Sequence, residues 1–329
     1  MFAILCELAL AQEGLAVGVN DNAAGFGVAA DDIRRIVESE VSGELALDDQ
    51  ESFLRAMAGA GALAGAGQGV AYGSQPKVIV VGASFGSAVD RGADAVDGES
   101  LPSFGVATQA GLMVGVPLRA FVPEDSIAAR FELYLGGMAN RTPNVASFVT
   151  RSASFGAHVQ ISLVEPAGTP QLGWGGVDVT TGVAWSRFSM GLNEQLALQA
   201  EINPVRVVWR TSGAFDVSAR SVSVPLELTT STNLAFLGIF AGGALDFRSA
   251  VATSDASLTG NLVAVADGQG ETHIGEAALN LGARAVAPPV TPRLLVGLEI
   301  IAGPVRLYGQ GNLRVGSGLG AHGGLRFVL

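Results

Sequence analysis

Long segments of alternating residues run from Lys77 to the end of the chain, and they constrain its fold more than any other feature. Between Val305 and Val315 apolar residues and glycines alternate with polar residues, and after the break at 316–318 the alternation resumes as far as Leu329. Because successive side chains of a strand point to opposite faces, this pattern predicts two strands with one apolar and one polar face. A final apolar strand has to be covered, and closing a barrel is one way to cover it.

The same pattern recurs upstream. Segments 150–165, 195–210 and 214–230 alternate most clearly, the second with an interruption at Pro204. Many of the segments reach the roughly 9–11 residues with which a tilted strand crosses a membrane, whereas strands of soluble sheets usually have about 5–6. The sequence therefore predicts an all-β fold, an antiparallel transmembrane β-barrel over residues 77–329.

The number of strands follows less directly. About thirteen segments can be recognised after Lys77, including separate strands at 177–188, 234–248 and 258–266, but single-chain bacterial barrels have even numbers. Either segment 214–230 holds two strands, or a further short strand lies near 15–19. We expect about 14 strands, with about 12 as the second choice.

Composition agrees with a barrel wall and excludes other classes of protein. Hydrophobic residues make up 49% of the chain and charged residues 15%, and the mean hydropathy is +0.41. No apolar run is long enough for a spanning helix, so the hydrophobic residues suit strands with a lipid-facing side. The aromatic content of 6% is low for a barrel with two aromatic girdles. A net charge of −11 argues against a nucleic-acid partner, and the single cysteine, Cys6, allows no disulfide within the chain.

Two segments precede the predicted barrel. Residues 1–11 are apolar and end in Ala9-Leu10-Ala11, the small-x-small form of a signal-peptidase site, so we interpret them as a signal-peptide remnant. Residues 12–76 are acidic and mainly helical, and they run into an Ala/Gly tract at 58–65. This segment either plugs the barrel or caps it from outside.

As a plug, the segment would present apolar groups on one side and acids to the wall. Its predicted apolar face consists of Ile33, Ile36, Phe53 and Leu54. Its acids would pair with arginines of the lumen; they are Asp31, Asp32, Glu38, Glu40 and Glu44.

The polar parity of the last strands supplies the candidate lumen residues. They are Arg284, Arg306, Tyr308, Gln310, Arg314, His322 and Arg326. The opposite parity should face lipid, because an arginine there costs about 2–4 kcal/mol near the midplane. The lipid-facing residues of the last two strands are Leu307, Leu313, Leu319, Leu325 and Phe327.

Motifs for catalysis or metal binding are weak. Residues 82–86 match the G-x-S-x-G nucleophile elbow, but the residues after Ser84 lack the helical periodicity that this motif needs. His158, His273 and His322 lack metal-ligand spacing, so they more simply line a polar lumen or an interface. We expect no enzyme activity, no catalytic residue, no metal and no cofactor.

Together the leader, the helical segment and the long strands resemble FadL-type outer-membrane channels. Residues 20–26, Asn-Asp-Asn-Ala-Ala-Gly-Phe, are similar to the Asn-Pro-Ala-Gly segment of that family without its proline. The resemblance implies a channel for uptake or export of hydrophobic or amphipathic small molecules, fatty-acid-like, with an N-terminal plug; it carries over no ligand-contact residue.

Two other functions stay open. One is a non-transporting barrel that anchors or scaffolds a surface or periplasmic partner; the other is a soluble exported β-sandwich or solenoid, which the strand lengths disfavour. The expected location is the bacterial outer membrane. The expected partners are its lipid, a hydrophobic ligand and, through the C-terminal strand, the barrel-assembly machinery.

Overall fold

The computed structural model describes residues 14–35, 47–73, 76–91, 104–141, 148–169, 172–202, 205–266 and 270–329. The predicted leader, residues 1–11, lies outside these ranges, as do Ile36, Glu38, Glu40 and Glu44.

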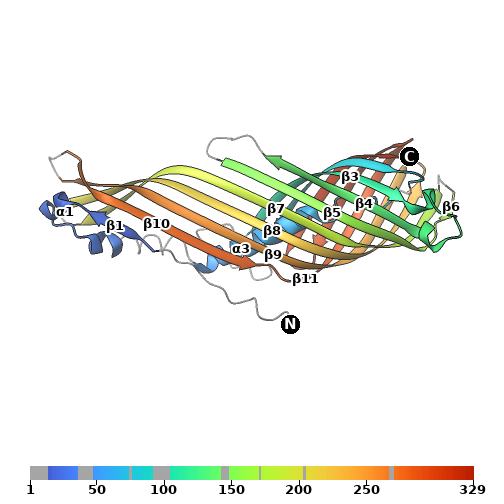
Figure 1. Ribbon diagram of the computed structural model, residues 1–329, viewed down its shortest axis with the longest axis horizontal. Helices are drawn as coiled ribbons and strands as arrows, with labels where there is room; N and C mark the ends of the chain where they lie inside the picture. The colour runs from blue at the N-terminus through green and yellow to red at the C-terminus, as the bar shows by residue number, and fades with distance from the viewer. Residues whose placement is uncertain are drawn as a thin grey trace.

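The described residues form one sheet of thirteen strands whose neighbours are antiparallel (Figure 1). The strands are β1 (Ala16–Val19), β2 (Val80–Asp90), β3 (Gly105–Pro117), β4 (Phe131–Arg141), β5 (Phe148–Val164), β6 (Ala167–Gly168), β7 (Leu172–Ile202), β8 (Val205–Leu234), β9 (Leu237–Val265), β10 (Thr272–Val286), β11 (Val290–Ala302), β12 (Val305–Arg314) and β13 (Gly318–Val328).

The sheet closes into a barrel. From β2 the neighbours follow in the order β3, β4, β5, β7, β8, β9, β11, β12 and β13, and β13 pairs back to β2 along its whole length. The predicted fold class, an antiparallel β-barrel, is confirmed. The short strand expected near 15–19 is β1, and segment 214–230 lies within the single strand β8.

Three strands are far longer than a barrel needs. β7, β8 and β9 have 31, 30 and 29 residues, and they continue beyond the barrel to one side (Figure 1). β9 pairs with β11 over 237–247 and with β10 over 251–264, so two strands share its length. With β1 added to β10, strands β7 to β10 form a protruding sheet, which we call the extension.

The strand boundaries at these positions differ from the prediction. Segments 234–248 and 258–266 are parts of one strand, β9, and segment 195–210 contains the end of β7 and the start of β8. The prediction placed breaks where small and polar residues interrupt the apolar parity, but β7, β8 and β9 continue through such residues beyond the barrel.

Helices come from the N-terminal segment and from one barrel loop. α1 (Asp21–Gly25) is capped by the side chain of Asn20, which accepts from the Asn22 amide; residues 30–35 are also helical. α3 (Leu47–Gly65) includes the Ala/Gly tract, and two short 3₁₀ helices, η1 (Leu118–Ala120) and η2 (Ile127–Arg130), follow β3. None of the described helices has the length and apolarity to span a membrane.

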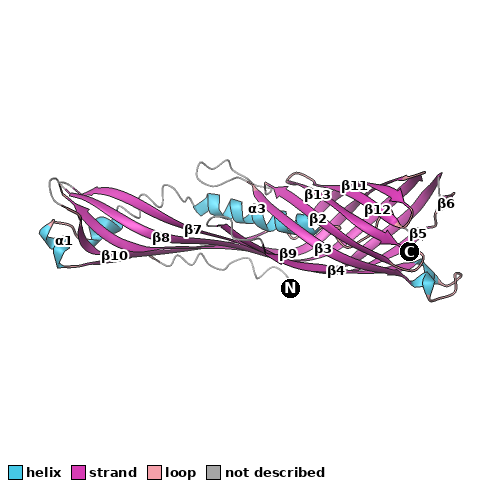
Figure 2. Ribbon diagram, turned by 90° about the horizontal axis from the view of Figure 1, so that it is seen from above, coloured by secondary structure: helices cyan, strands magenta, loops and turns pink. Residues whose placement is uncertain are grey.

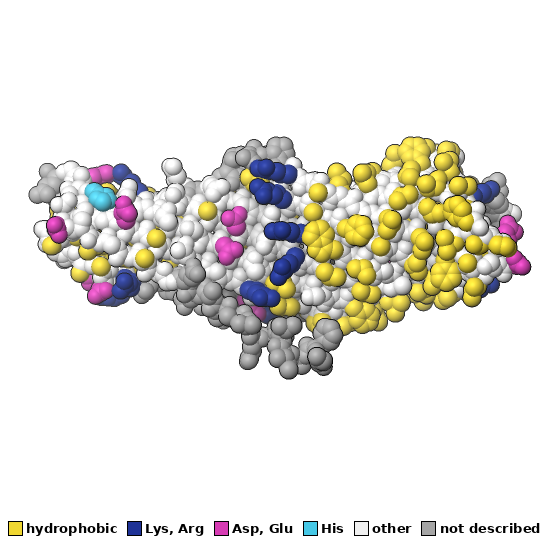
Figure 3. Space-filling view, viewed as in Figure 1, with side chains coloured by type: hydrophobic (Ala, Val, Ile, Leu, Met, Phe, Trp, Pro, Cys, Tyr) yellow, Lys and Arg dark blue, Asp and Glu magenta, His cyan; other side chains and the backbone are white. Residues whose placement is uncertain are grey.

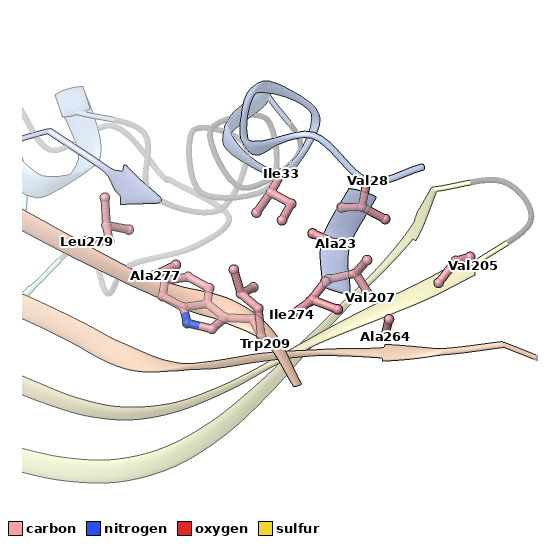
Figure 4. Packing of buried hydrophobic residues seen from close by; sticks show 11 residues of the cluster. Ala23, Val28, Ile33, Val205, Val207, Trp209, Ala264, Ile274, Ala277 and Leu279 are labelled. Atoms are coloured by element: carbon pink, nitrogen blue, oxygen red, sulfur yellow. The ribbon is translucent and has the colours of Figure 1, made fainter. Parts of the chain in front are cut away.

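The N-terminal segment covers the inner face of the extension and then enters the barrel. At the far end of the extension Ala23, Val28 and Ile33 pack on Trp209 and Ile274 (Figure 4). From the junction between extension and barrel, α3 then runs into the barrel (Figure 2).

The two faces of β8 exchange character where the barrel meets the extension. In the barrel its outward residues are apolar and its inward residues polar, as at Leu228 and Glu227. In the extension the inward residues are apolar, such as Val217 and Trp209, and exposed outward residues are polar, such as Asp216. Figure 3 shows the result, with hydrophobic side chains gathered over the barrel and sparse over the extension.

Candidate functional site: the plugged lumen

Helix α3 fits the lumen because small residues line it. Ala56, Ala60 and Ala64 are at most 1% exposed. Strand β3 comes so close at Gly105 that a Cβ there would lie 2.3 Å from the Met57 amide nitrogen. Only glycine allows this approach, so the low-complexity tract is a packing surface for the wall.

Apolar contacts accompany the segment along the lumen. Phe53 and Leu54 pack on alanines and Val217 of β8, β9 and the end of β10 at the junction with the extension. Further along, Leu63 packs on Ala88 and Ala107 of β2 and β3. The segment then leaves the helix, and residues 70–72 pack in the wall cluster that includes Phe240, Leu295 and Tyr134. The contacts therefore run from one end of the barrel to the other.

We call residues 47–73, the part of the N-terminal segment that runs along the lumen, the plug. Arginines of the wall donate hydrogen bonds to its backbone. Arg314 Nη1 donates to the Gly59 carbonyl at 3.0 Å and forms an ion pair with Asp90. Arg326 Nη2 donates to the Val70 carbonyl at 2.7 Å, and its guanidinium lies 3.6 Å from the centre of the Tyr308 ring. Arg314 therefore contacts the plug inside α3, and Arg326 contacts it beyond the end of that helix.

A second group of polar residues centres on Arg293. Its guanidinium donates to Asp246 Oδ2 at 2.9 Å, to Asn312 Oδ1 at 2.7 Å and to Glu227. The Tyr72 hydroxyl of the plug donates to the same Glu227 carboxylate. Arg293 and Glu227 are at most 2% exposed. This group ties the plug to four strands of the wall, β8, β9, β11 and β12.

The structure places most of the predicted lumen residues on the inner face. Tyr308, Gln310, Arg314, His322 and Arg326 are buried, at 5% exposure or less. Their outward neighbours are exposed, at 39–62% for the set Leu307, Leu313, Leu319, Leu325 and Phe327. Arg306 is half-buried.

The prediction for Arg284 is wrong. Arg284 is exposed on the outer face of β10, a strand that pairs with the part of β9 beyond the barrel. The inner face of β10 carries Leu279 and Ala285 instead. The error comes from treating β10 as a barrel strand, where the polar parity would face inward.

The predicted apolar face of the plug is divided between two places. Phe53 and Leu54 lie at the junction, whereas Ile33 belongs to the cluster at the far end of the extension. The predicted ion pairs of Asp31 and Asp32 with lumen arginines are also wrong. These acids pair with Arg34 and Arg35 one turn away, because their helix lies on the extension.

The wall arginines form ion pairs with acids of the wall. Arg293 pairs with Glu227 and Asp246, and Arg314 pairs with Asp90. Sequence reasoning missed Arg293 and its partners. A signal was present, since Arg293 and Glu299 share the parity opposite to Leu294 and Leu298 on a strand with an apolar outer face.

The wall has a seam between β3 and β4. Their pairing extends from Leu112↔Gly137 to Pro117↔Glu132, and no pairing joins residues 105–111 to 138–141, all of which the structure describes. At the seam the Gln68 amide of the plug donates to the Gln109 carbonyl at 3.2 Å. The plug thus donates one hydrogen bond to the part of β3 that β4 does not pair.

Two small cavities adjoin the plug in the part of the chain that the structure describes. A cavity beside the seam measures about 40 Å³ and is lined by plug residues such as Gln68 and by outer-surface residues such as Leu112 and Phe155. A second cavity, near Arg293 and Arg314, measures about 20 Å³. Such volumes hold a few water molecules, whereas pockets for drug-sized ligands measure roughly 300–1,000 Å³.

The motifs considered for chemistry lie apart from one another. Ser84 is in the middle of β2, with strand on both sides, so the helix of a nucleophile elbow does not follow it. His158 and His322 are buried inside the barrel, and His273 is exposed at the end of the extension. Within the described ranges no three histidine, cysteine or acidic side chains gather as a metal site.

Comparison with known proteins gives one family match and several structural likenesses. A family model described as Lsa36-like matches residues 27–329. No curated protein matches the chain.

Among solved structures, the outer-membrane protease OmpT from Escherichia coli is 10% identical over 80% of this chain and 99% of that chain, with a TM-score of 0.39. A Pseudomonas aeruginosa FadL homologue is 9% identical over 84% and 98%, with a TM-score of 0.25. The translocator domain of the autotransporter NalP from Neisseria meningitidis is 8% identical over 76% and 88%, with a TM-score of 0.29. These likenesses concern the fold and assign no activity.

Proposed function

The chain belongs to the Lsa36-like family, and we propose that it is a bacterial outer-membrane barrel that anchors the extension and displays it beyond the membrane. The observation that carries this proposal is the filled lumen. The described part of the N-terminal segment contacts the wall along the lumen, and Arg314 and Arg326 hold it by its backbone, so we expect no open passage for a solute.

The extension supports the same function. Three strands continue past the apolar outer surface, and the faces of β8 exchange character there, as expected when a sheet passes from lipid into water. Its hydrophobic side is already covered by α1 and by residues near Ile33. The outer face is therefore free to meet a partner in water, while the barrel supplies the attachment.

The proposal assigns no reaction. Its partners are the lipid around the barrel, the assembly machinery that would recognise β13, and a surface or periplasmic partner of the extension.

Membrane location is tested on the outer face of β11. Leu298 is 53% exposed in the middle of the strand, so Leu298→Arg should lower the free energy of unfolding in phosphatidylcholine vesicles by about 2–4 kcal/mol. Ser212→Arg, at an exposed position in the extension, is the control and should change it by less than about 0.5 kcal/mol. Equal effects at the two positions would contradict a lipid-facing wall.

Anchoring is tested by conductance in planar bilayers. The intact chain should give no stable open channel, because the lumen is filled, and a variant without residues 47–73 should open a pore. A large conductance that is the same with and without the plug would refute the proposal.

A second function, a channel for hydrophobic small molecules, is favoured by the seam. The cavity there adjoins both the plug and the outer residues Leu112 and Phe155, so a greasy ligand could exchange with lipid through the wall if Gln68 moved. Vesicles that contain the chain should then take up a fluorescent fatty acid faster than empty vesicles. Gln68→Ala should raise the rate further, and Gln199→Ala in the extension should not; uptake equal to that of empty vesicles would exclude this function.

A further inference from the structure

A row of exposed arginines crosses the outer face of the sheet where the apolar surface of the barrel ends (Figure 3). We call it the arginine row. Its members come from β4, β5, β7, β8 and β10; they are Arg141, Arg151, Arg187, Arg220 and Arg284.

Strand register brings these arginines together. Arg141 lies directly opposite Arg151, and Arg187 lies directly opposite Arg220. Arg151 is opposite Ser189, two residues along β7 from Arg187 and on the same face. At about 4.8 Å between neighbouring strands, the first four arginines span about 15 Å.

Like charges directly opposite each other destabilise a sheet. In the part of the chain that the structure describes, no ion pair involves any member of the row. Asp216, on β8, is four residues from Arg220, about 13 Å away. Asp255, opposite Asp216 on β9, is a diagonal neighbour of Arg284, with which it forms no ion pair within the described ranges. Other exposed arginines do form ion pairs: Arg210 pairs with Glu271 and Arg130 pairs with Glu165.

On the barrel side the row borders a line of large apolar side chains. Phe155 is opposite Trp185, and Trp185 is opposite Val222; the three are 57%, 39% and 45% exposed. Trp185 and Val222 are each two residues from an arginine of the row, on the same face. Aromatic side chains of this kind lie at the interface of a bilayer.

We propose that the arginine row binds the phosphate groups of lipid headgroups in the leaflet on the side of the extension. The inference rests on the membrane location proposed above. A guanidinium binds phosphate oxygens through paired hydrogen bonds, so a phosphate between Arg187 and Arg220 would replace their repulsion with two attractions. Headgroup phosphates lie at the end of the hydrocarbon layer, level with the residues just beyond Trp185 and Phe155, and this position selects a lipid over a free anion.

The test uses the full chain in phosphatidylcholine vesicles with and without lipid A. The phosphate of phosphatidylcholine is neutralised by its own choline group, whereas the phosphates of lipid A are free to pair with arginine. The variant Arg151→Gln/Arg187→Gln/Arg220→Gln removes the centre of the row. The control Arg130→Gln/Arg206→Gln/Arg210→Gln removes the same charge from exposed arginines elsewhere. Lipid A binding is measured by native mass spectrometry and by the rise in the urea midpoint that a bound ligand causes.

We expect the row variant to bind lipid A about 10- to 100-fold more weakly than the wild type, and the control to bind it like the wild type. Inorganic phosphate alone should leave the midpoint of the wild type unchanged. If the row variant inserts into pure phosphatidylcholine like the wild type and keeps full affinity for lipid A, the inference fails and the membrane location stands. The same stabilisation by inorganic phosphate would also overturn it, and a wild type that enters no vesicle would overturn both proposals.

Discussion

Removal of the Arg293 guanidinium should destabilise the barrel strongly, because two carboxylates depend on it. In Arg293→Met, Glu227 and Asp246 stay buried, at 2% and 7% exposure, and lose the hydrogen bonds that Arg293 donates to them. Breaking a buried ion pair by removing one partner costs about 3–5 kcal/mol, since an uncompensated charge stays behind. We expect a loss of that size in the free energy of unfolding.

The matched variant removes all three charges. Buried ion pairs often contribute little net stability relative to neutral groups of the same shape, so Arg293→Met/Glu227→Gln/Asp246→Asn should recover most of the loss. Tyr72→Phe removes the plug's donor to Glu227 and should cost about 1.5–3 kcal/mol, the range for hydrogen bonds to charged groups.

Urea unfolding in phosphatidylcholine vesicles, followed by heat-modifiable gel migration, measures each free energy. A loss below about 1 kcal/mol in Arg293→Met would refute the argument, since it would mean that water reaches the carboxylates. A triple variant no more stable than Arg293→Met would show that charge is not the cause.

Two further predictions concern packing. In Gly105→Ala the new Cβ would lie 2.3 Å from the backbone of α3, so the free energy of unfolding in vesicles should fall by about 1–3 kcal/mol. Gly309→Ala, whose Cβ would lie 4.0 Å from its nearest atom, is the control and should leave this free energy unchanged. Equal effects of the two substitutions would contradict the tight fit of the plug. Trp209→Ala removes the largest side chain of the cluster at the end of the extension and should lower the local free energy of unfolding by about 3–5 kcal/mol. Limited proteolysis should then cleave the extension and leave the barrel intact, whereas Trp174→Ala, at a 43% exposed position, is the control and should leave both intact. Unfolding of the whole barrel in the Trp209 variant would contradict separate packing of the two parts.

The sequence was sufficient to predict the barrel and the faces of its last strands. Alternation carries this information, because lipid selects apolar residues on one parity and a crowded interior tolerates polar ones on the other. That is why Leu307 and Leu325 are outward and Tyr308 and Arg326 are inward. Helix α3 was predictable as well, because it lies in the segment predicted to be helical and carries Phe53 and Leu54 on its apolar face.

The pairings inside the lumen could not be predicted. Arg293 meets Glu227 from 66 residues away, and only the register of β8, β9 and β11 brings them together. The path of the N-terminal segment, from the extension into the barrel, also depends on tertiary contacts. No residue between 12 and 76 indicates that Ile33 and Leu54 belong to different clusters, because an apolar face has the same pattern whichever surface covers it.

The length of β8 was readable in principle, although a search for separate apolar strands misses it. From the barrel toward lower residue numbers, the outward residues of β8 are apolar from Leu228 to Val222 and mostly polar from Arg220 to Arg206. Its inward residues change from polar to apolar at the same point, between Ser221 and Ala219. A turn would interrupt both parities, whereas a change of surroundings exchanges them and leaves the strand continuous. If the barrel lies in a membrane as proposed, the exchange marks the boundary between lipid and water within one strand, and the arginine row lies at that boundary. A sequence in which the two parities exchange without a turn thus predicts both a strand longer than the membrane and the position of the headgroups along it.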